Sequence, residues 1–82
     1  GEGPVPTVFR IDGFRFFFYS AEPGEPVHVH VTKGDGVGKW WVDPVAEEWS
    51  DGFTKREIRA INRHVSGHRG SIIELWNDHF KR

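Results

Sequence analysis

Two histidines one residue apart, His28 and His30, are the residues of this sequence best suited to acid–base chemistry. They alternate with valines in the run VHVHV, and side chains alternate between the two faces of a strand, so both imidazoles are expected on one face, about 6 to 7 Å apart. Imidazoles titrate near neutral pH and can serve as general base and general acid. With Arg15 or Arg10 supplying a cation for a phosphorane-like charge, one interpretation of the set is a metal-independent, ribonuclease-like site with catalytic residues His28, His30 and Arg15.

A metal site is the alternative chemistry for the same histidines. It needs a third ligand, and a hairpin turn at Asp35-Gly36 would place Asp43 opposite His28. The resulting set of two histidines and one carboxylate is His28, His30 and Asp43. The chain has no cysteine, which excludes thiolate sites and disulfides. We expect no cofactor. The simplest alternative is that the two histidines face solvent and have no chemical role.

Aromatic and basic residues offer a third interpretation, a nucleic-acid-binding surface. Aromatic rings on the strand face of the histidines could stack unpaired bases. The binding surface predicted for this face consists of Phe17, Tyr19, Trp41, Asp43 and Arg10. Further along the chain, arginines that recur every three or four residues could contact phosphates, although a charged helix face is most often simply solvated. These arginines are Arg56, Arg59 and Arg63.

The strands that position these residues are expected in two hairpins. Asp12-Gly13 and Asp35-Gly36 each stand between strand-like runs and readily accept the positive φ angles of a two-residue turn. The predicted strands are 7–11 with 14–19, and 27–33 with 37–43. Two prolines and a glycine predict a loop over 20–26, and the segment 44–53 is expected to be a connector.

A two-residue turn also fixes which side chains lie opposite each other. In the first hairpin these pairs are Phe9 with Phe16 and Ile11 with Phe14. In the second hairpin they are Val31 with Trp40, Val29 with Val42, His30 with Trp41 and His28 with Asp43.

Two helices are predicted after the hairpins. Thr54 followed by Glu57 has the capping-box pattern, which predicts a helix over about 54–66. Its apolar residues recur at three- and four-residue steps and form one stripe, Ile58, Ile61 and Val65. After a break at Ser66-Gly67 or Arg69-Gly70, a second stripe predicts a second helix and consists of Ile72, Ile73, Trp76 and Phe80.

These elements predict an α+β fold, a four-stranded antiparallel sheet of two β-hairpins with two C-terminal helices packed on one face. The whole chain, 1–82, is expected to form a single domain, with a flexible extension at 1–5, hairpins at 7–43 and helices at 54–82. Nothing in the chain is long enough to cover the other face of the sheet. An uncovered aromatic face indicates a binding surface.

Composition and charge further limit the class of protein to which the chain can belong. The 82 residues include seven Phe, four Trp and one Tyr, which give a small core enough apolar area. The net charge of −1 does not indicate a nucleic-acid partner, and any basic surface must be confined to one part of the molecule. No apolar run approaches the ~20 residues of a membrane span. We expect a cytoplasmic protein that does not contact membranes.

The chain resembles the short prokaryotic proteins grouped as the domain of unknown function numbered 4160. The motifs that carry the resemblance are Pro6-Thr7-Val8, Gly13 to Ser20, Glu25 to Val31, Lys39 to Trp41, Gly52-Phe53-Thr54 and Trp76-Asn77 with Phe80. Members commonly have two prolines before the first histidine, where this chain has Pro26-Val27. The resemblance implies an uncharacterised protein whose gene stands beside a second small gene in a toxin–antitoxin-like arrangement.

The resemblance therefore implies a small partner protein. The leading prediction is one component of a toxin–antitoxin-type pair that acts by binding its partner through the open sheet face. A ribonuclease-like toxin using His28 and His30, or an RNA-binding module, is the alternative. Whether the chain is toxin or antitoxin, and its oligomeric state, stay open at this point.

Overall fold

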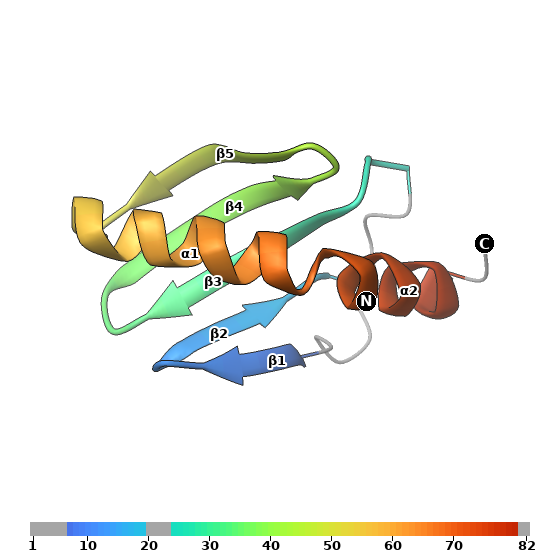
Figure 1. Cartoon of the computed structure of the whole chain (residues 1–82), viewed down its shortest axis with the longest axis horizontal. Coiled ribbons are helices and arrows are strands. Elements are labelled where there is room, and N and C mark those ends of the chain that lie inside the picture. The colour runs from blue at the N-terminus through green and yellow to red at the C-terminus, as the bar shows by residue number, and fades with distance from the viewer. Residues whose placement is uncertain (1–6, 20–23, 81–82) are drawn as a thin grey trace.

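A computed structural model of the chain describes residues 7–19 and 24–80, so the extension predicted at 1–5 and residues 20–23 of the predicted loop lie outside it. The described residues form a five-stranded antiparallel sheet and two helices, an α+β fold as predicted (Figure 1). Neighbours in the sheet are also neighbours in the chain. The elements are β1 (Thr7–Ile11), β2 (Phe14–Phe17), β3 (His28–Lys33), β4 (Gly36–Val42), β5 (Val45–Asp51), α1 (Lys55–Gly67) and α2 (Arg69–Phe80).

The prediction of four strands is wrong, because the expected connector contains β5. This strand pairs with β4 at the edge of the sheet, and most of its side chains are exposed. A strand whose two faces are both largely solvated does not need alternating apolar residues. Because Glu47 and Glu48 interrupt that alternation, the hydrophobic pattern does not predict this strand. A register irregularity between Lys39 and Trp40 disturbs the alternation further.

The first hairpin has the predicted register. Phe9 lies opposite Phe16 and Ile11 opposite Phe14 across the Asp12-Gly13 turn. The rings of Phe9 and Phe16 stack with their centroids 4.4 Å apart. Local turn chemistry was therefore sufficient to position these side chains.

The predicted register of the second hairpin is wrong by two residues. Its turn is Gly34-Asp35, with Gly34 at a φ of +57°, so Val29 lies opposite Trp40. Gly36 belongs to β4 because the ring of Phe53 covers it, and a Cβ at this position would lie 2.4 Å from that ring. A shift by an even number of residues leaves each side chain on its predicted face but changes every partner.

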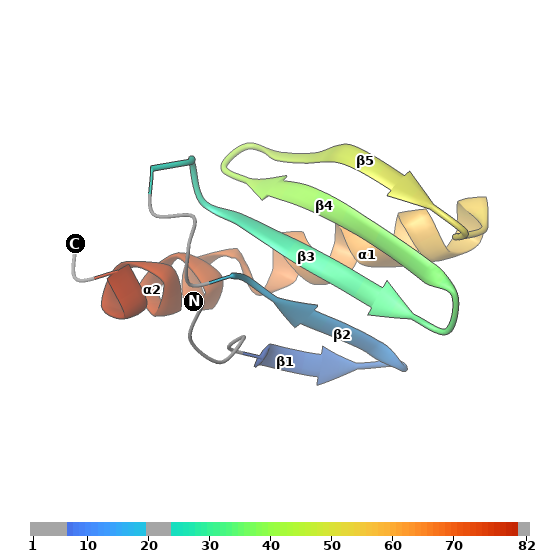
Figure 2. The same ribbon diagram turned by 180° about the vertical axis from the view of Figure 1, so that it is seen from behind.

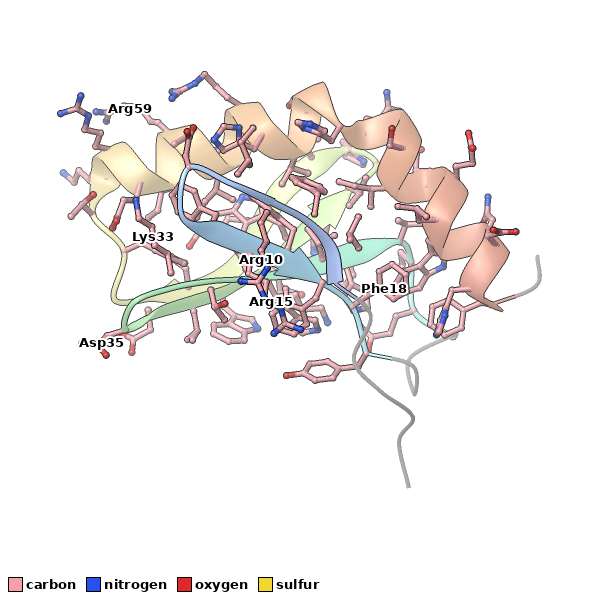
Figure 3. All side chains as sticks on the ribbon, turned by 90° about the horizontal axis from the view of Figure 1, so that it is seen from below. Arg10, Arg15, Phe18, Lys33, Asp35 and Arg59 are labelled. Atoms are coloured by element: carbon pink, nitrogen blue, oxygen red, sulfur yellow. The ribbon has the colours of Figure 1, made fainter. Side chains whose placement is uncertain are left out.

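Both predicted helices are present and lie on one side of the sheet (Figure 1). The helix axis breaks at His68, whose Nδ1 and backbone N–H both lie against the carbonyl oxygen of His64. Beyond the break, α2 turns from the α1 axis toward the sheet (Figure 3) and extends past the ends of the strands (Figure 1). Among the residues that the structure describes, no helix is long and apolar enough to cross a membrane.

The hydrophobic core fills the space between the sheet and these helices. Trp40 is fully buried there, and its indole Nε1 donates a 2.7 Å hydrogen bond to Oδ1 of Asn62. Gly38 makes room for it, since a Cβ at this glycine would lie 2.5 Å from the Trp40 ring. The central cluster consists of Phe14, Phe16, Val29, Val31, Trp40, Val42, Ile61, Val65 and Ile72.

The predicted capping box at the start of α1 is present. The Thr54 hydroxyl accepts from the Glu57 N–H at 3.0 Å, and Oε1 of Glu57 accepts from the Thr54 N–H at 2.9 Å. Thr54→Ala is expected to lower the free energy of unfolding by about 1 kcal/mol, measured by urea denaturation. Ser66→Ala, an exposed serine of the same helix, is the control and is expected to change stability little. Equal losses in the two variants would contradict a capping role.

Candidate functional site

One side of the sheet is free of helices, and we call it the open face (Figure 2). The strand register arranges its side chains in rows that run across the sheet. One row joins Phe17, His30, Lys39 and Trp49 from four strands. A second row joins Arg15, Thr32, Val37 and Asp51, and a third joins His28, Trp41 and Ala46.

His28 belongs to this face by register, but the prediction that it is exposed is wrong. Its side chain is completely buried. It lies near the start of β3, where α2 extends past the strands, and its ring packs edge-on against Trp76 at 4.9 Å between centroids. Its Nδ1 lies 2.9 Å from the Pro26 carbonyl oxygen, which only accepts, so Nδ1 carries the hydrogen.

His30 is half-buried and belongs to an aromatic cluster. Its ring stacks on Phe17 at 5.6 Å and meets Tyr19 edge-on at 4.6 Å. The rings of His28 and His30 lie 5.2 Å apart and nearly perpendicular, slightly closer than their strand spacing predicts. The two imidazoles are therefore neighbours in different environments, one inside the protein and one at the surface.

A hollow of about 290 Å³ opens beside this cluster on the open face. Tyr19 and Trp49 are large side chains that remain exposed, at 37% and 47%, and Val37 is exposed to a similar degree. His30 and Tyr19 contribute an imidazole and a phenol to an otherwise mostly apolar lining. The lining residues are Phe17, Tyr19, His30, Val31, Thr32, Val37, Gly38 and Trp49.

Two cations of the open face lie over aromatic rings: Arg15, which was predicted for this face, and Lys39, which was not. The guanidinium of Arg15 lies over Phe17, 4.4 Å from the ring centroid. Lys39 lies over the Trp41 ring at 4.7 Å and donates to Oε1 of Glu25 at 2.6 Å. Arg10 lies opposite Arg15 and is exposed at the β1 edge, on the side of the sheet away from α1 (Figure 3).

The opposite edge of the sheet is acidic. β5 exposes Glu47, Glu48 and Asp51. Of these acids, Asp51 lies in a row of the open face, whereas Glu47 lies opposite the core residue Trp40 and therefore on the helix-covered face. The open face thus has an apolar centre between a basic flank at β1 and β2 and the carboxylate of Asp51 on β5. Charge of both signs around an aromatic hollow is the main electrostatic property of the surface.

The structure does not bring Asp43 to the histidines. Asp43 lies in the turn between β4 and β5, and its carboxylate pairs with Arg69 at the start of α2, while Trp41 is the residue opposite His28. Within residues 7–19 and 24–80, no group of three or more His, Cys, Asp or Glu side chains could hold a metal ion. The alternative set of His28, His30 and Asp43 is therefore not assembled as a site.

Trp49 and Val37 are surface residues that the sequence analysis did not assign to the open face. Trp49 was hidden because β5 was not recognised. Asp43-Pro44 is a turn signal between two runs that contain Val and Trp, and it was the clue available in the sequence.

The three predicted phosphate contacts lie elsewhere in the molecule. Arg56, Arg59 and Arg63 are all exposed on α1, which packs against the other side of the sheet. Arg59 points away from the sheet (Figure 3). The aromatic hollow and the arginines are therefore separate surfaces.

A family model described as "Domain of unknown function (DUF4160)" matches residues 13–77. The match includes β2 to β5, α1 and most of α2, and with them the residues of the open face. Neither a curated protein nor a solved structure shows a significant match to the chain.

Proposed function

This chain belongs to the DUF4160 family, and on that premise we propose that it is a binding protein whose open face holds a small partner protein, as one component of a toxin–antitoxin-type pair. The observation that carries the proposal is the aromatic hollow. Of the four large hydrophobic side chains exposed within the described residues, Tyr19, Val37 and Trp49 line it, and only Leu75 lies elsewhere. Exposed apolar side chains gathered on one face are typical of a protein interface.

The charges around the hollow support a protein partner over a nucleic acid. A nucleic-acid backbone is uniformly negative, and phosphates would approach the exposed acids of β5 unfavourably. Lys39 already pairs with Glu25, and its side chain is only 14% exposed, so it offers little to a phosphate. A protein segment can instead present opposite charges to the two flanks.

The geometry of the hollow also indicates which side chains the partner should present. An aromatic or branched apolar side chain would fill the hollow, and Trp49 and Tyr19 would pack against it from either side. A Lys or Arg beside that anchor would meet the acids of β5. This combination of apolar anchor and basic neighbour is the motif we expect on the partner.

The ribonuclease-like alternative has less support. An acid–base pair must reach the substrate, and His28 is completely buried with Nδ1 directed at Pro26. Arg15 covers Phe17 beside the hollow and could still meet an anion. The arrangement suits His28 as a packing residue and His30 as part of the binding surface.

Combining Trp49→Ala with Tyr19→Ala is expected to weaken binding of the small protein encoded beside the gene by at least about tenfold, because central aromatic anchors dominate interface energies. Isothermal titration calorimetry measures the change. Leu75→Ala is the matched control, since Leu75 is 44% exposed but lies on α2. A double variant that binds as tightly as the wild type would place the interface elsewhere.

The toxin–antitoxin role has its own readout in bacterial growth. Expression of one member of the pair alone should arrest growth, and co-expression of the other should relieve the arrest. The Trp49/Tyr19 double variant should disrupt this relationship at unchanged protein level, whereas Leu75→Ala should preserve it. Binding without any growth effect would retain the partner and remove the toxin–antitoxin role.

A further inference from the structure

A second hollow, of about 370 Å³, lies between α1 and the turn regions of the sheet. Its walls come from the first two turns of α1 and Arg63 on one side, and from Asp12, Phe14 and Lys33 on the other. This hollow plays no part in the partner binding proposed above. Its lining residues are Asp12, Phe14, Lys33, Thr54, Arg56, Glu57, Ala60 and Arg63.

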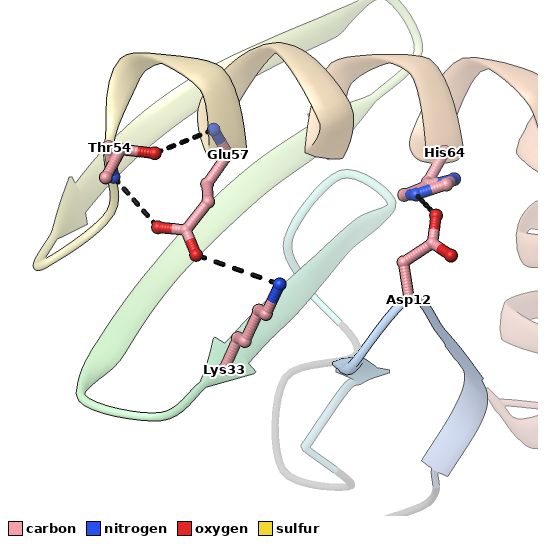
Figure 4. A network of polar contacts seen from close by, with 5 residues as sticks. All are labelled: Asp12, Lys33, Thr54, Glu57 and His64. Carbon is pink, nitrogen blue, oxygen red and sulfur yellow. Dashed lines mark hydrogen bonds and ion pairs between the residues drawn. The ribbon is translucent and has the colours of Figure 1, made fainter.

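The acids of this hollow are already occupied (Figure 4). Glu57 accepts from the Thr54 N–H through Oε1, and its Oε2 lies 3.8 Å from Nζ of Lys33. Oδ2 of Asp12 lies 3.0 Å from Nε2 of His64, without hydrogen-bond geometry, so this contact is an ion pair when the imidazole is protonated. Both carboxylates therefore have positive or polar neighbours within the protein.

The arginines of the hollow are not occupied. Among the described residues, neither Arg56 nor Arg63 makes a hydrogen bond or an ion pair. Lys33, with Nζ 4.6 Å from the centroid of the Phe14 ring, is shared with Glu57, so the net positive charge of the hollow comes from the two guanidinium groups. The hollow therefore presents two unpaired guanidinium groups beside a fixed ammonium group.

We infer that this hollow binds backbone phosphates of a nucleic-acid strand. Guanidinium groups bind phosphate oxygens through paired hydrogen bonds, and Lys33 would serve as a point charge. Arg56 and Arg63 are seven residues apart, or about 10.5 Å along the helix axis, which suits two phosphates of one polymer better than a single free phosphate. The Phe14 ring is buried, so the site offers no exposed ring for base stacking and should bind without sequence preference.

Arg59 provides a control that distinguishes phosphate binding in the hollow from non-specific electrostatic attraction to the protein surface. It belongs to the same helix and likewise makes no hydrogen bond or ion pair among the described residues, but it does not line the hollow and points away from the sheet (Figure 3). Arg10 is likewise exposed and lies on the open face. Replacing Arg10 and Arg59 removes the same charge as replacing Arg56 and Arg63, but leaves the hollow intact.

Fluorescence anisotropy with a labelled oligouridylate of about 12 nucleotides tests the inference. Arg56→Ala/Arg63→Ala should weaken binding by at least about tenfold at about 50 mM salt and reduce the magnitude of the slope of log affinity against log salt by about 1.4. Arg10→Ala/Arg59→Ala should weaken binding no more than about threefold. Circular dichroism should show both variants folded, because all four side chains are exposed.

Three results would overturn the inference. Equal losses in the two double variants would mean diffuse attraction, and a wild-type Kd above about 100 μM at low salt would be weaker than ordinary non-specific nucleic-acid binding and would mean that the hollow is not a phosphate site. An oligoglutamate peptide that binds as tightly, with the same dependence on Arg56 and Arg63, would mean a site for acidic protein. The Trp49/Tyr19 double variant should retain full oligouridylate binding, so failure of the partner interface and failure of this site are distinguishable.

Discussion

His28→Ala is expected to lower the free energy of unfolding by about 2 to 4 kcal/mol. The substitution removes a completely buried ring, leaves a cavity against Trp76 and deprives the Pro26 carbonyl of its hydrogen-bond donor. A domain of this length is stable by roughly 4 to 12 kcal/mol, so the loss is a large share of the total. Urea denaturation followed by circular dichroism and tryptophan fluorescence measures it.

His30→Ala is the matched control for this prediction. The neighbouring imidazole is only half-buried and stacks at the surface on Phe17, so the expected loss is below about 1.5 kcal/mol. A larger loss at His30 than at His28 would contradict the packing role assigned to His28. It also follows that reduced activity of a His28→Ala protein says nothing about catalysis unless its folded fraction is measured.

Trp40→Ala is expected to be more severe, with a loss of about 3 to 5 kcal/mol. Trp40 is fully buried at the centre of the core, between the sheet and α1, and Gly38 is shaped to accommodate its ring. The substitution also leaves Oδ1 of Asn62 without the indole donor. We expect a protein that is largely unfolded at physiological temperature, which would be seen as the loss of a cooperative melting transition.

Trp40→Phe separates packing from the hydrogen bond. It retains most of the buried ring and removes the indole N–H, so the expected loss is about 1 to 3 kcal/mol. Asn62→Ala removes the acceptor alone, and its loss should overlap with that of Trp40→Phe when the two are combined, because both break one bond. Fully additive losses would mean that the Trp40–Asn62 bond contributes nothing of its own.

The two surfaces lie on opposite sides of the sheet. The aromatic hollow, with Trp49 and Tyr19, is on the open face, and the unpaired arginines Arg56 and Arg63 border a hollow on the side covered by α1. Because the sheet and core separate them, a partner protein and a nucleic-acid strand could be bound simultaneously.

Local chemistry in the sequence determined much of this fold. The Asp12-Gly13 turn set the register of the first hairpin, and the Thr54–Glu57 capping box set the start of α1. The period-two pattern correctly assigned the faces of β2, β3 and β4, because that pattern depends on burial alone. Family membership was also readable from the chain, since residues 13–77 carry the matching motifs.

Tertiary structure decided the rest. The rings of Phe53 and Trp40 cover Gly36 and Gly38 and so select the register of the second hairpin. The turn residues alone do not determine this register. Hydrogen bonding to β4 makes β5 a strand despite its charged side chains, and so brings Trp49 to the open face. Likewise α2 extends past the strands and places Trp76 on His28, turning the apparently exposed histidine of VHVHV into a core residue. The contacts of Phe53 with Gly36 and of Trp76 with His28 join segments that are distant in the chain, and whether they meet depends on how the whole core packs.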